Sequence, residues 1–229
     1  KREAPANWRE TWDGIEAFRK ANVADVDTMG CGILASQLEP KVYRYQTLVA
    51  LQLSSQTKDS VLAPCIAQLQ AHKPGGLTVD SVLAMDTEVL HNYIRTIGFH
   101  NKKTVTLKET AKILKERYDG DIPPTLEELM ELPGVGPKMA YLCMQHAWNK
   151  SLGIGVDVHV HRISNRMGWV KTGKAQENIT RMELEDWLPA ERWGPVNTLL
   201  VGFGQTLCRP IGPKCHECPV KDLCPKIGV

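Results

Sequence analysis

The sequence predicts an all-α protein, and three observations carry that prediction. Apolar residues recur at helical spacing along most of the chain, as in the stripe formed by Val42, Tyr45, Val49 and Leu53. Strands of alternating apolar and polar residues, separated by turn signals, are absent. A compact run of glycine and proline at 133–137 separates two helical segments by a tight hairpin. We therefore expect helices joined by short loops.

Local signals place the individual helices. Asp86 is a typical N-cap, and Gly98 has the character of a left-handed C-cap that ends the same helix. The segment Val23–Glu39 contains two glycines and predicts an irregular connector. The helices that we expect cover 7–22, 40–53, a short one from 78, 86–97, the basic block 101–118, 139–148, 156–167, 176–188 and 193–205.

Length and composition limit the class of protein. The chain has 229 residues, of which 42% are apolar and 24% charged, which is typical of a soluble globular protein with one large or two small domains. No apolar run reaches ~18 residues, so we expect no membrane span. The net charge of +2 is small, but residues 101–118 carry six Lys and Arg against two Glu. Such blocks are usually solvated helix faces, but this one precedes the hairpin and fits a surface that follows phosphates.

The hairpin itself is a candidate anion site. Pro137 fits the first turn of the helix that follows, where its missing N–H costs nothing. The amides of Gly134, Val135 and Gly136 are then free to point outward at the positive end of that helix, where a nucleic-acid phosphate would bind. The alternative is an ordinary turn between two helices. Lys138, directly after the turn, favours the phosphate site.

Three motifs together resemble one known family. Residues 132–138 read LPGVGPK, residues 156–159 read VDVH, and four cysteines lie near the end of the chain. This combination resembles the endonuclease III family of bifunctional helix-hairpin-helix DNA glycosylases, in its eukaryotic form. The matching landmarks run from about Tyr45 to Cys224, and the first forty residues match more loosely. The resemblance implies a six-helix domain at 39–150, with the helix-hairpin-helix at about 125–148, and a discontinuous helical domain at 1–38 and 151–229.

The resemblance also implies a reaction. Lys138 would attack C1′ of a deoxyribose, displace the damaged base and form a Schiff base, and β-elimination would then cut the strand. A lysine beside a phosphate site is more often a counter-charge, since a nucleophile needs a neutral amine and free lysine titrates near ~10.4. Burial and the helix N-terminus would favour the neutral form. Asp157 would stabilise positive charge on the sugar, a role compatible with capping the next helix.

The resemblance assigns DNA contacts as well. Gln56 matches the residue that fills the hole left by an extruded base, and Phe99 matches one that wedges into the duplex, although an apolar residue there often only packs against its own turn. We expect Lys102 and Lys103 to contact phosphates, and His159 to lie near the active site. On a strand, Asp157, His159 and His161 would instead share one face and could hold a metal; helix geometry excludes that site.

The cysteine tail predicts a cofactor. Cys208, Cys215, Cys218 and Cys224 lie within 17 residues and could hold zinc, an iron–sulfur cluster or disulfides. The spacing alone leaves these alternatives open, and the resemblance implies a [4Fe–4S] cluster with a structural role.

The resulting prediction is a base-excision repair enzyme. We expect an N-glycosylase that removes oxidised pyrimidines from double-stranded DNA and that is also an abasic-site lyase. It would act as a monomer on damaged or abasic duplexes, away from membranes, in the nucleus or the mitochondrion. Two alternatives are a related adenine mismatch glycosylase, which lacks a lysine at the position of Lys138, and a non-catalytic DNA-binding module of the same fold.

Overall fold

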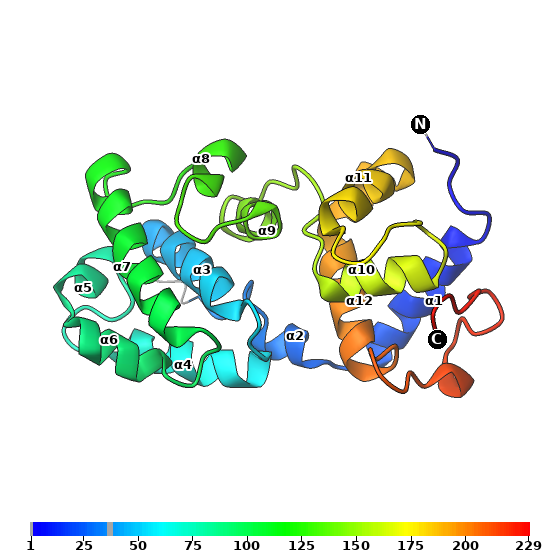
Figure 1. Cartoon of the computed structure of the whole chain (residues 1–229), viewed down its shortest axis with the longest axis horizontal. Coiled ribbons are helices and arrows are strands. Elements are labelled where there is room, and N and C mark those ends of the chain that lie inside the picture. The colour runs from blue at the N-terminus through cyan, green and yellow to red at the C-terminus, as the bar shows by residue number, and fades with distance from the viewer. Residues whose placement is uncertain (1, 36–38) are drawn as a thin grey trace. The chain divides into compact units, whose positions relative to one another are not determined.

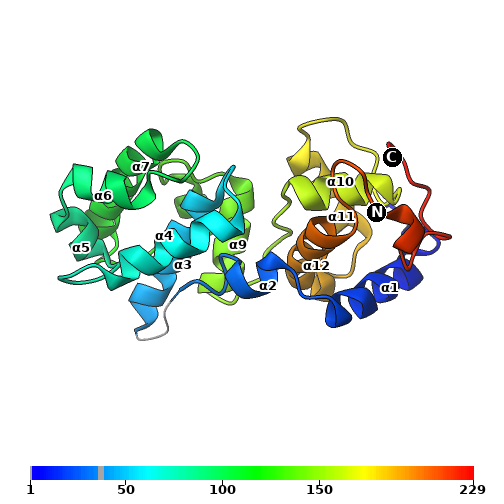
Figure 2. The ribbon, with the colours of Figure 1, turned by 90° about the horizontal axis from the view of Figure 1, so that it is seen from below.

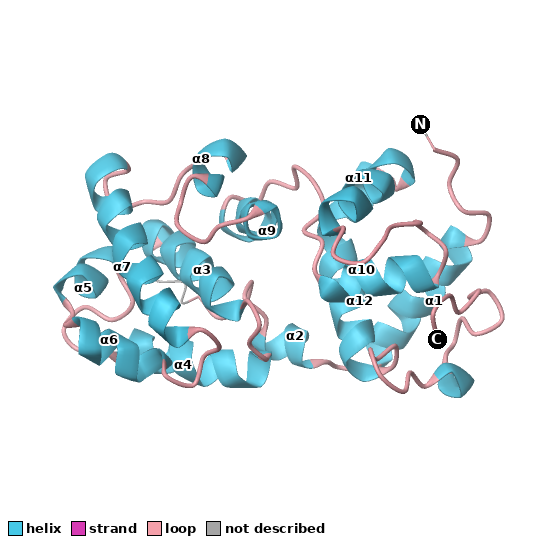
Figure 3. Cartoon of the chain, viewed as in Figure 1, coloured by secondary structure: helices cyan, strands magenta, loops and turns pink. Residues whose placement is uncertain are grey.

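The all-α prediction is confirmed by the computed structural model, which describes residues 2–35 and 39–229. Within those two stretches every regular element is a helix (Figure 3). None of the helices in this part of the chain combines the length and the apolar character that a membrane span requires. The α-helices are α1 Trp8–Ala21, α2 Asp25–Met29, α3 Pro40–Ser54, α4 Asp59–Ala71, α5 Val79–Ala84, α6 Thr87–Ile94, α7 His100–Arg117, α8 Leu126–Met130, α9 Pro137–Ala147, α10 Val158–Arg166, α11 Glu177–Trp187 and α12 Trp193–Thr206. Two single 3₁₀ turns add to these, at Ala190–Arg192 and Cys215–Glu217.

The chain forms two compact units. Residues 1–28 and 151–229 make up one unit, and residues 29–150 make up the other. The predicted connector 23–39 is wrong in part, because α2 lies within it; residues 36–38 of the connector are outside the described residues. A helix of five residues is little more than one turn, so its apolar residues are too few to show a period.

The unit of residues 29–150 is built around α3. This helix packs against α4, α7 and α9 (Figure 1), and every residue from Tyr45 to Leu53 is buried. The sequence predicted one apolar stripe, whereas the helix is enclosed on all sides because its polar Gln46, Thr47 and Gln52 are buried too. A helix so enclosed gives the segments at its ends a fixed support.

The other unit is built around α12. This helix packs against α1 and α10 (Figure 2), with Phe18 of α1 edge-on to Phe203 of α12 at 5.8 Å between ring centroids. Gly202 lets α1 approach closely, since a Cβ there would lie 2.2 Å from the guanidinium of Arg19. That guanidinium is thereby free to pair with Asp27 at 2.6 Å. Close packing of α12 on α10 fixes the helix whose first residues carry the VDVH motif.

Candidate catalytic and nucleic-acid-binding residues

The hairpin between α8 and α9 has the geometry that the sequence predicts. Gly134 adopts φ +72°, a conformation that favours glycine, and Pro137 is the first residue of α9. In the described part of the chain the amides of Gly134 and Gly136 donate to no protein acceptor. The prediction for Val135 is wrong, because its amide donates to the carbonyl of Leu132 at 3.2 Å and its side chain is buried. Two outward amides, rather than three, therefore remain for an anion.

A buried amide that the sequence analysis missed holds this hairpin in place. Gln52 of α3 donates from Nε2 to the carbonyl of Pro133 at 3.1 Å and to the hydroxyl of Thr110 at 3.0 Å. A glutamine among the apolar residues of a central helix is itself a signal, since a buried polar side chain needs a partner.

Lys138 is the second residue of α9 and lies half-buried directly behind the hairpin. Burial raises the pKa of the neighbouring Cys31 thiol to about 11, and the charge of Lys138 offsets part of that rise. Cys31 in turn donates to the carbonyl of Ala50 in α3 at 3.5 Å. Lys138 thus lies near Cys31 at the positive end of α9, an end that favours an anion.

Gln56 and Phe99 lie in two turns of the same unit, and both side chains are exposed. Their backbones are left-handed, with φ of +52° and +59°. Gly98 does not serve as the left-handed C-cap that the sequence predicted, because α6 ends at Ile94 and Phe99 takes the positive φ. The glycine is needed for space instead, since a Cβ at Gly98 would lie 2.8 Å from the carbonyl oxygen of Gln56.

The two adjacent lysines at the start of α7, Lys102 and Lys103, differ in their exposure to solvent. Lys102 is exposed, as a phosphate contact must be. The prediction for Lys103 is wrong: its side chain is 7% exposed, and its amine donates to the carbonyls of Leu53 and Ser55 at 2.8 and 2.6 Å. Burial lowers the pKa of Lys103 to about 8. A lysine directed into the protein cannot reach a phosphate.

Asp157 lies in the other unit and caps α10, as the sequence predicted. Its Oδ1 accepts from the amides of His159 and Val160 at 2.9 and 2.8 Å. The second oxygen, Oδ2, accepts no hydrogen bond in the described part of the chain. The cap therefore fixes the carboxylate at the mouth of a helix and leaves one oxygen available.

His159 is held by its neighbours in the same unit. Arg162 donates from Nη2 to its Nδ1 at 3.2 Å, and to the carbonyl of Cys208 at 2.9 Å. A Cβ at Gly204 would lie 2.4 Å from His159 Nδ1, so the ring packs closely on α12. The imidazole of His159 is thus held in a fixed orientation. Along the chain it lies two residues after Asp157, the N-cap of the same helix.

The alternative metal site in residues 156–161 does not form. Residues from Val158 on are helical, so His159 and His161 point in different directions. His161 instead shares a hydrogen bond of 2.7 Å with the hydroxyl of Thr180. Among the residues that the structure describes, no three His, Cys, Asp or Glu side chains are arranged to hold one metal ion.

The four tail cysteines line one cavity. Apolar side chains of α12 and of the tail form part of its wall, among them Phe203, Leu207 and Val220. Burial raises the pKa of the Cys218 and Cys224 thiols, and the neighbouring thiolates raise it further. All four side chains are partly buried, so the cavity offers a shared set of sulfur donors.

A buried cation that the sequence analysis missed organises this tail. Arg166, at the end of α10, is 7% exposed and donates to the carbonyls of Arg209 and Pro210 at 2.6 and 3.0 Å. Its own carbonyl accepts from the amide of Ile227 at 3.1 Å. No local signal in the sequence marks Arg166, because its partners lie 43 and 44 residues further along the chain.

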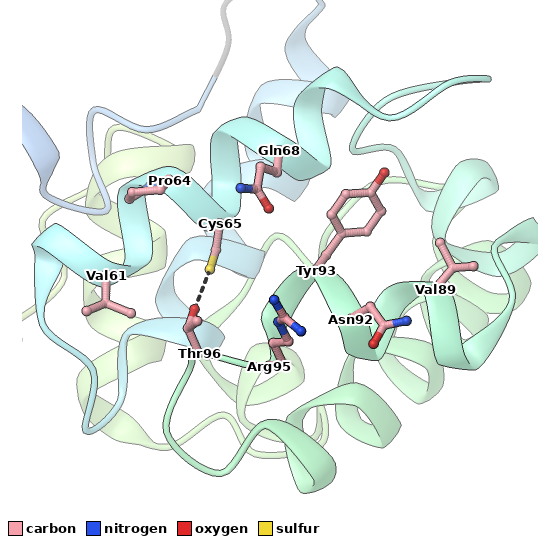
Figure 4. Close-up of a pocket in the computed structure, with 9 residues that line it drawn as sticks. All are labelled: Val61, Pro64, Cys65, Gln68, Val89, Asn92, Tyr93, Arg95 and Thr96. Atoms are coloured by element: carbon pink, nitrogen blue, oxygen red, sulfur yellow. Dashed lines mark hydrogen bonds between the residues drawn. The ribbon is translucent and has the colours of Figure 1, made fainter.

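A pocket of 740 Å³ lies between α4 and α6 (Figure 4). Cys65 forms part of its wall and shares a hydrogen bond of 3.3 Å with the hydroxyl of Thr96, and Tyr93 and Arg95 also line it. None of the residues predicted for catalysis or DNA contact lines this pocket. The candidate residues lie instead at the hairpin and at the start of α10.

Comparison with known proteins identifies the family of this chain. Residues 49–190, which include the hairpin and the α10 cap, match the model of the HhH-GPD superfamily of base excision DNA repair proteins. The chain is 52% identical over 223 residues to the endonuclease III homolog of Schizosaccharomyces pombe, covering 96% of this chain and 62% of that protein. It is 49% identical over 222 residues to the endonuclease III-like protein 1 of Gallus gallus, covering 96% of this chain and 78% of that protein.

The fold matches as well. A solved structure described as a trapped covalent intermediate of endonuclease III and DNA superposes with a TM-score of 0.80 at 26% identity, covering 96% of this chain and 95% of that one. A second, a non-covalent complex of endonuclease III with DNA, gives a TM-score of 0.81 at 25% identity, with 96% and 94% covered. The chain belongs to the HhH-GPD superfamily of base excision DNA repair proteins, and within it to the endonuclease III family.

Proposed function

We propose that this protein is a DNA N-glycosylase that removes oxidised pyrimidines from duplex DNA and then cuts the strand as an abasic-site lyase. The observation that carries the proposal is Lys138, an amine at the N-terminus of α9 directly behind the two outward amides of the hairpin. An anion site beside a half-buried amine is what covalent attack on a nucleic-acid sugar requires. The similarity to endonuclease III homologues over 96% of this chain supports the same reaction.

The reaction runs in two steps through one residue. The neutral amine of Lys138 forms a bond to C1′ as the bond from C1′ to the base breaks, and the departing base anion takes up a proton from water. The Lys138 nitrogen, now bonded to C1′ and positively charged, passes one proton to O4′ as the C1′–O4′ bond breaks, which leaves a protonated Schiff base on the open sugar. Loss of a proton from C2′ expels the 3′ phosphate. The free Oδ2 of Asp157 stabilises the positive charge that develops on the sugar as the base leaves.

The target base must leave the duplex before its C1′ can meet an amine. Extrusion costs a few kcal/mol of stacking and pairing, which side chains inserted in the gap offset. Gln56 and Phe99, exposed on two turns, are the proposed inserted residues. Lys102 and the amides of Gly134 and Gly136 are the proposed phosphate contacts, so double-stranded DNA is the proposed partner.

The test is turnover on defined duplexes. The protein should release the base and nick the strand of a duplex with one oxidised pyrimidine, and borohydride should trap a covalent complex during the reaction. Binding without any nick on an abasic duplex would instead indicate a non-catalytic DNA-binding module. Excision of adenine from a mismatch with no lyase step would indicate the adenine glycosylase branch.

The proposed cofactor is a [4Fe–4S] cluster held by Cys208, Cys215, Cys218 and Cys224. The four thiols line one cavity, and their spacing along the chain is the one that the resemblance to the endonuclease III family implies for a cluster in which each thiolate binds a different iron. When bound, the cluster would link the tail to the end of α12, a structural role.

The cluster prediction can be checked directly. Purified protein should be yellow-brown and contain about four iron and four sulfide per chain. Cys215→Ser removes one ligand and should lose the cluster and with it much of the folded protein, because ligand binding and folding of the tail are coupled. Cys65→Ser, a thiol outside the tail, is the matched control and should keep the iron. A folded, colourless protein with one zinc would contradict the proposal.

The proposed location is a compartment that contains DNA. A repair enzyme must meet its duplex, so the nucleus and the mitochondrion are the proposed sites. Fluorescent tagging of the full-length protein in cells, with markers for both compartments, distinguishes them.

A further inference from the structure

The turns that carry Gln56 and Phe99 are held in an unfavourable backbone conformation. A positive φ costs a non-glycine residue free energy, most of all a bulky one such as phenylalanine. Such residues keep that conformation only when their surroundings hold them. The side chain of Phe99 is no part of that support, because the residue is 62% exposed. The support must therefore come from contacts of the two turns with other groups.

One residue contacts both turns. The backbone amide of Lys103 donates to the carbonyl of Phe99 at 3.0 Å, the first helical bond of α7, so the lysine lies one turn from Phe99. Its side-chain amine donates to the carbonyls of Leu53 and Ser55, on the approach to Gln56. The amine also lies 3.5 Å from the hydroxyl of Thr57, on the far side of Gln56. Gln56 is thus flanked on both sides by groups bonded to Lys103.

The two turns also contact each other directly. The amide of Gly98 donates to the hydroxyl of Thr57 at 3.3 Å, and Gly98 has the close approach to the Gln56 carbonyl described above. Gly98, which precedes Phe99, is therefore hydrogen-bonded to Thr57, which follows Gln56. A shift of one turn would disturb the other.

The chemistry of the amine suits this role. All three acceptors are neutral oxygen atoms, and an ammonium has three N–H groups to match them. The carbonyls lie at the C-terminal end of α3, where the helix dipole attracts a cation. Because α3 is enclosed on all sides, it gives the amine a rigid base from which to hold both turns.

We propose that Lys103 is a positioning residue that, together with Thr57, holds the Gln56 and Phe99 turns in one arrangement, so that both side chains enter the duplex together. This rests on the proposed function, since it concerns the residues that fill the gap left by the base. The simpler alternative is that Lys103 only caps the C-terminus of α3 and supports the fold.

Coupling between variants separates the two roles. Lys103→Met keeps the length of the side chain but cannot donate, and should slow single-turnover excision about tenfold or more, because misplaced groups are costly. In a background with both Gln56→Ala and Phe99→Ala the same change should slow excision less than about twofold, since both side chains that it positions are gone. A 2-aminopurine opposite the lesion should brighten on binding to the wild type and respond less to Lys103→Met.

Two further variants complete the design. Thr57→Val removes the hydroxyl that joins the turns but leaves the α3 carbonyls bonded to Lys103, and Thr57→Ser restores it; only the valine should slow excision. This pair keeps the proposal testable if Lys103→Met does not fold. The neighbouring Lys102→Met should lower the log–log salt slope of DNA binding by roughly 0.9, whereas Lys103→Met should leave the slope unchanged.

The outcomes are distinct. Equal losses from Lys103→Met in the presence and in the absence of the Gln56 and Phe99 side chains, with an unchanged 2-aminopurine signal, would show that Lys103 supports only the fold and would overturn the proposal. A lower salt slope for Lys103→Met would overturn it too, by placing the amine on a phosphate. An inactive wild type would contradict the proposed function instead, because every ratio here takes the wild type as its reference.

Discussion

Lys138→Gln should abolish both strand cleavage and borohydride crosslinking to a lesion duplex. Glutamine keeps a side chain of similar length with a polar end, but an amide cannot form an imine with C1′. The expected loss exceeds three orders of magnitude in the single-turnover rate, because no other route to the covalent intermediate remains. The measurement is denaturing gel analysis of nicked and crosslinked strands under single-turnover conditions.

The fold and the DNA affinity of this variant provide its controls. Lys138 is half-buried at the start of α9, so its replacement should change the melting temperature little. Binding to lesion DNA should fall by the loss of about one counterion, a change of roughly 0.9 in the log–log salt slope. Crosslinking at near wild-type yield would make another amine the nucleophile and would return Lys138 to a phosphate contact.

The sequence predicted those features of the site that depend on local residue order. Pro137 begins α9 and Asp157 caps α10 because each effect involves only residues within one turn of the same helix. The all-α class followed in the same way from helical spacing, which is also a local pattern.

Features that depend on distant packing were not predictable in this way. Lys102 and Lys103 are adjacent and chemically identical, and they differ only because one faces the end of α3. The sequence predicted Gly98 as a helix C-cap, whereas in the structure its lack of a side chain leaves space for the carbonyl of Gln56 from another turn. In the sequence Arg166 is indistinguishable from an exposed helical arginine, and only its bond to the tail carbonyl of Arg209 sets it apart. Each case requires knowing which segment lies opposite, and one sequence carries no local sign of that.

The proposed reaction is divided between two residues of different kinds. Lys138 forms a covalent bond to C1′ of the sugar, whereas Asp157 contributes only a negative charge that stabilises the sugar. Substitution of the two residues should therefore affect different steps. Removal of the amine blocks every covalent step. Removal of the charge affects the step in which the sugar becomes positive, which is the departure of the base. A substrate from which the base has already gone should therefore separate the two residues.

Asp157→Asn should slow base excision by about two to three orders of magnitude and spare the reaction on a preformed abasic site. Asparagine is also a good N-cap, so the amides of His159 and Val160 keep an acceptor and stability should change by less than ~1 kcal/mol. A neutral amide does not stabilise a cationic sugar, hence the loss on an intact lesion. On an abasic site the aldehyde meets the amine of Lys138 directly, so cleavage should stay within about tenfold of the wild type. Equal losses on both substrates, measured as single-turnover rates, would mean that Asp157 acts on the amine rather than on the departing base.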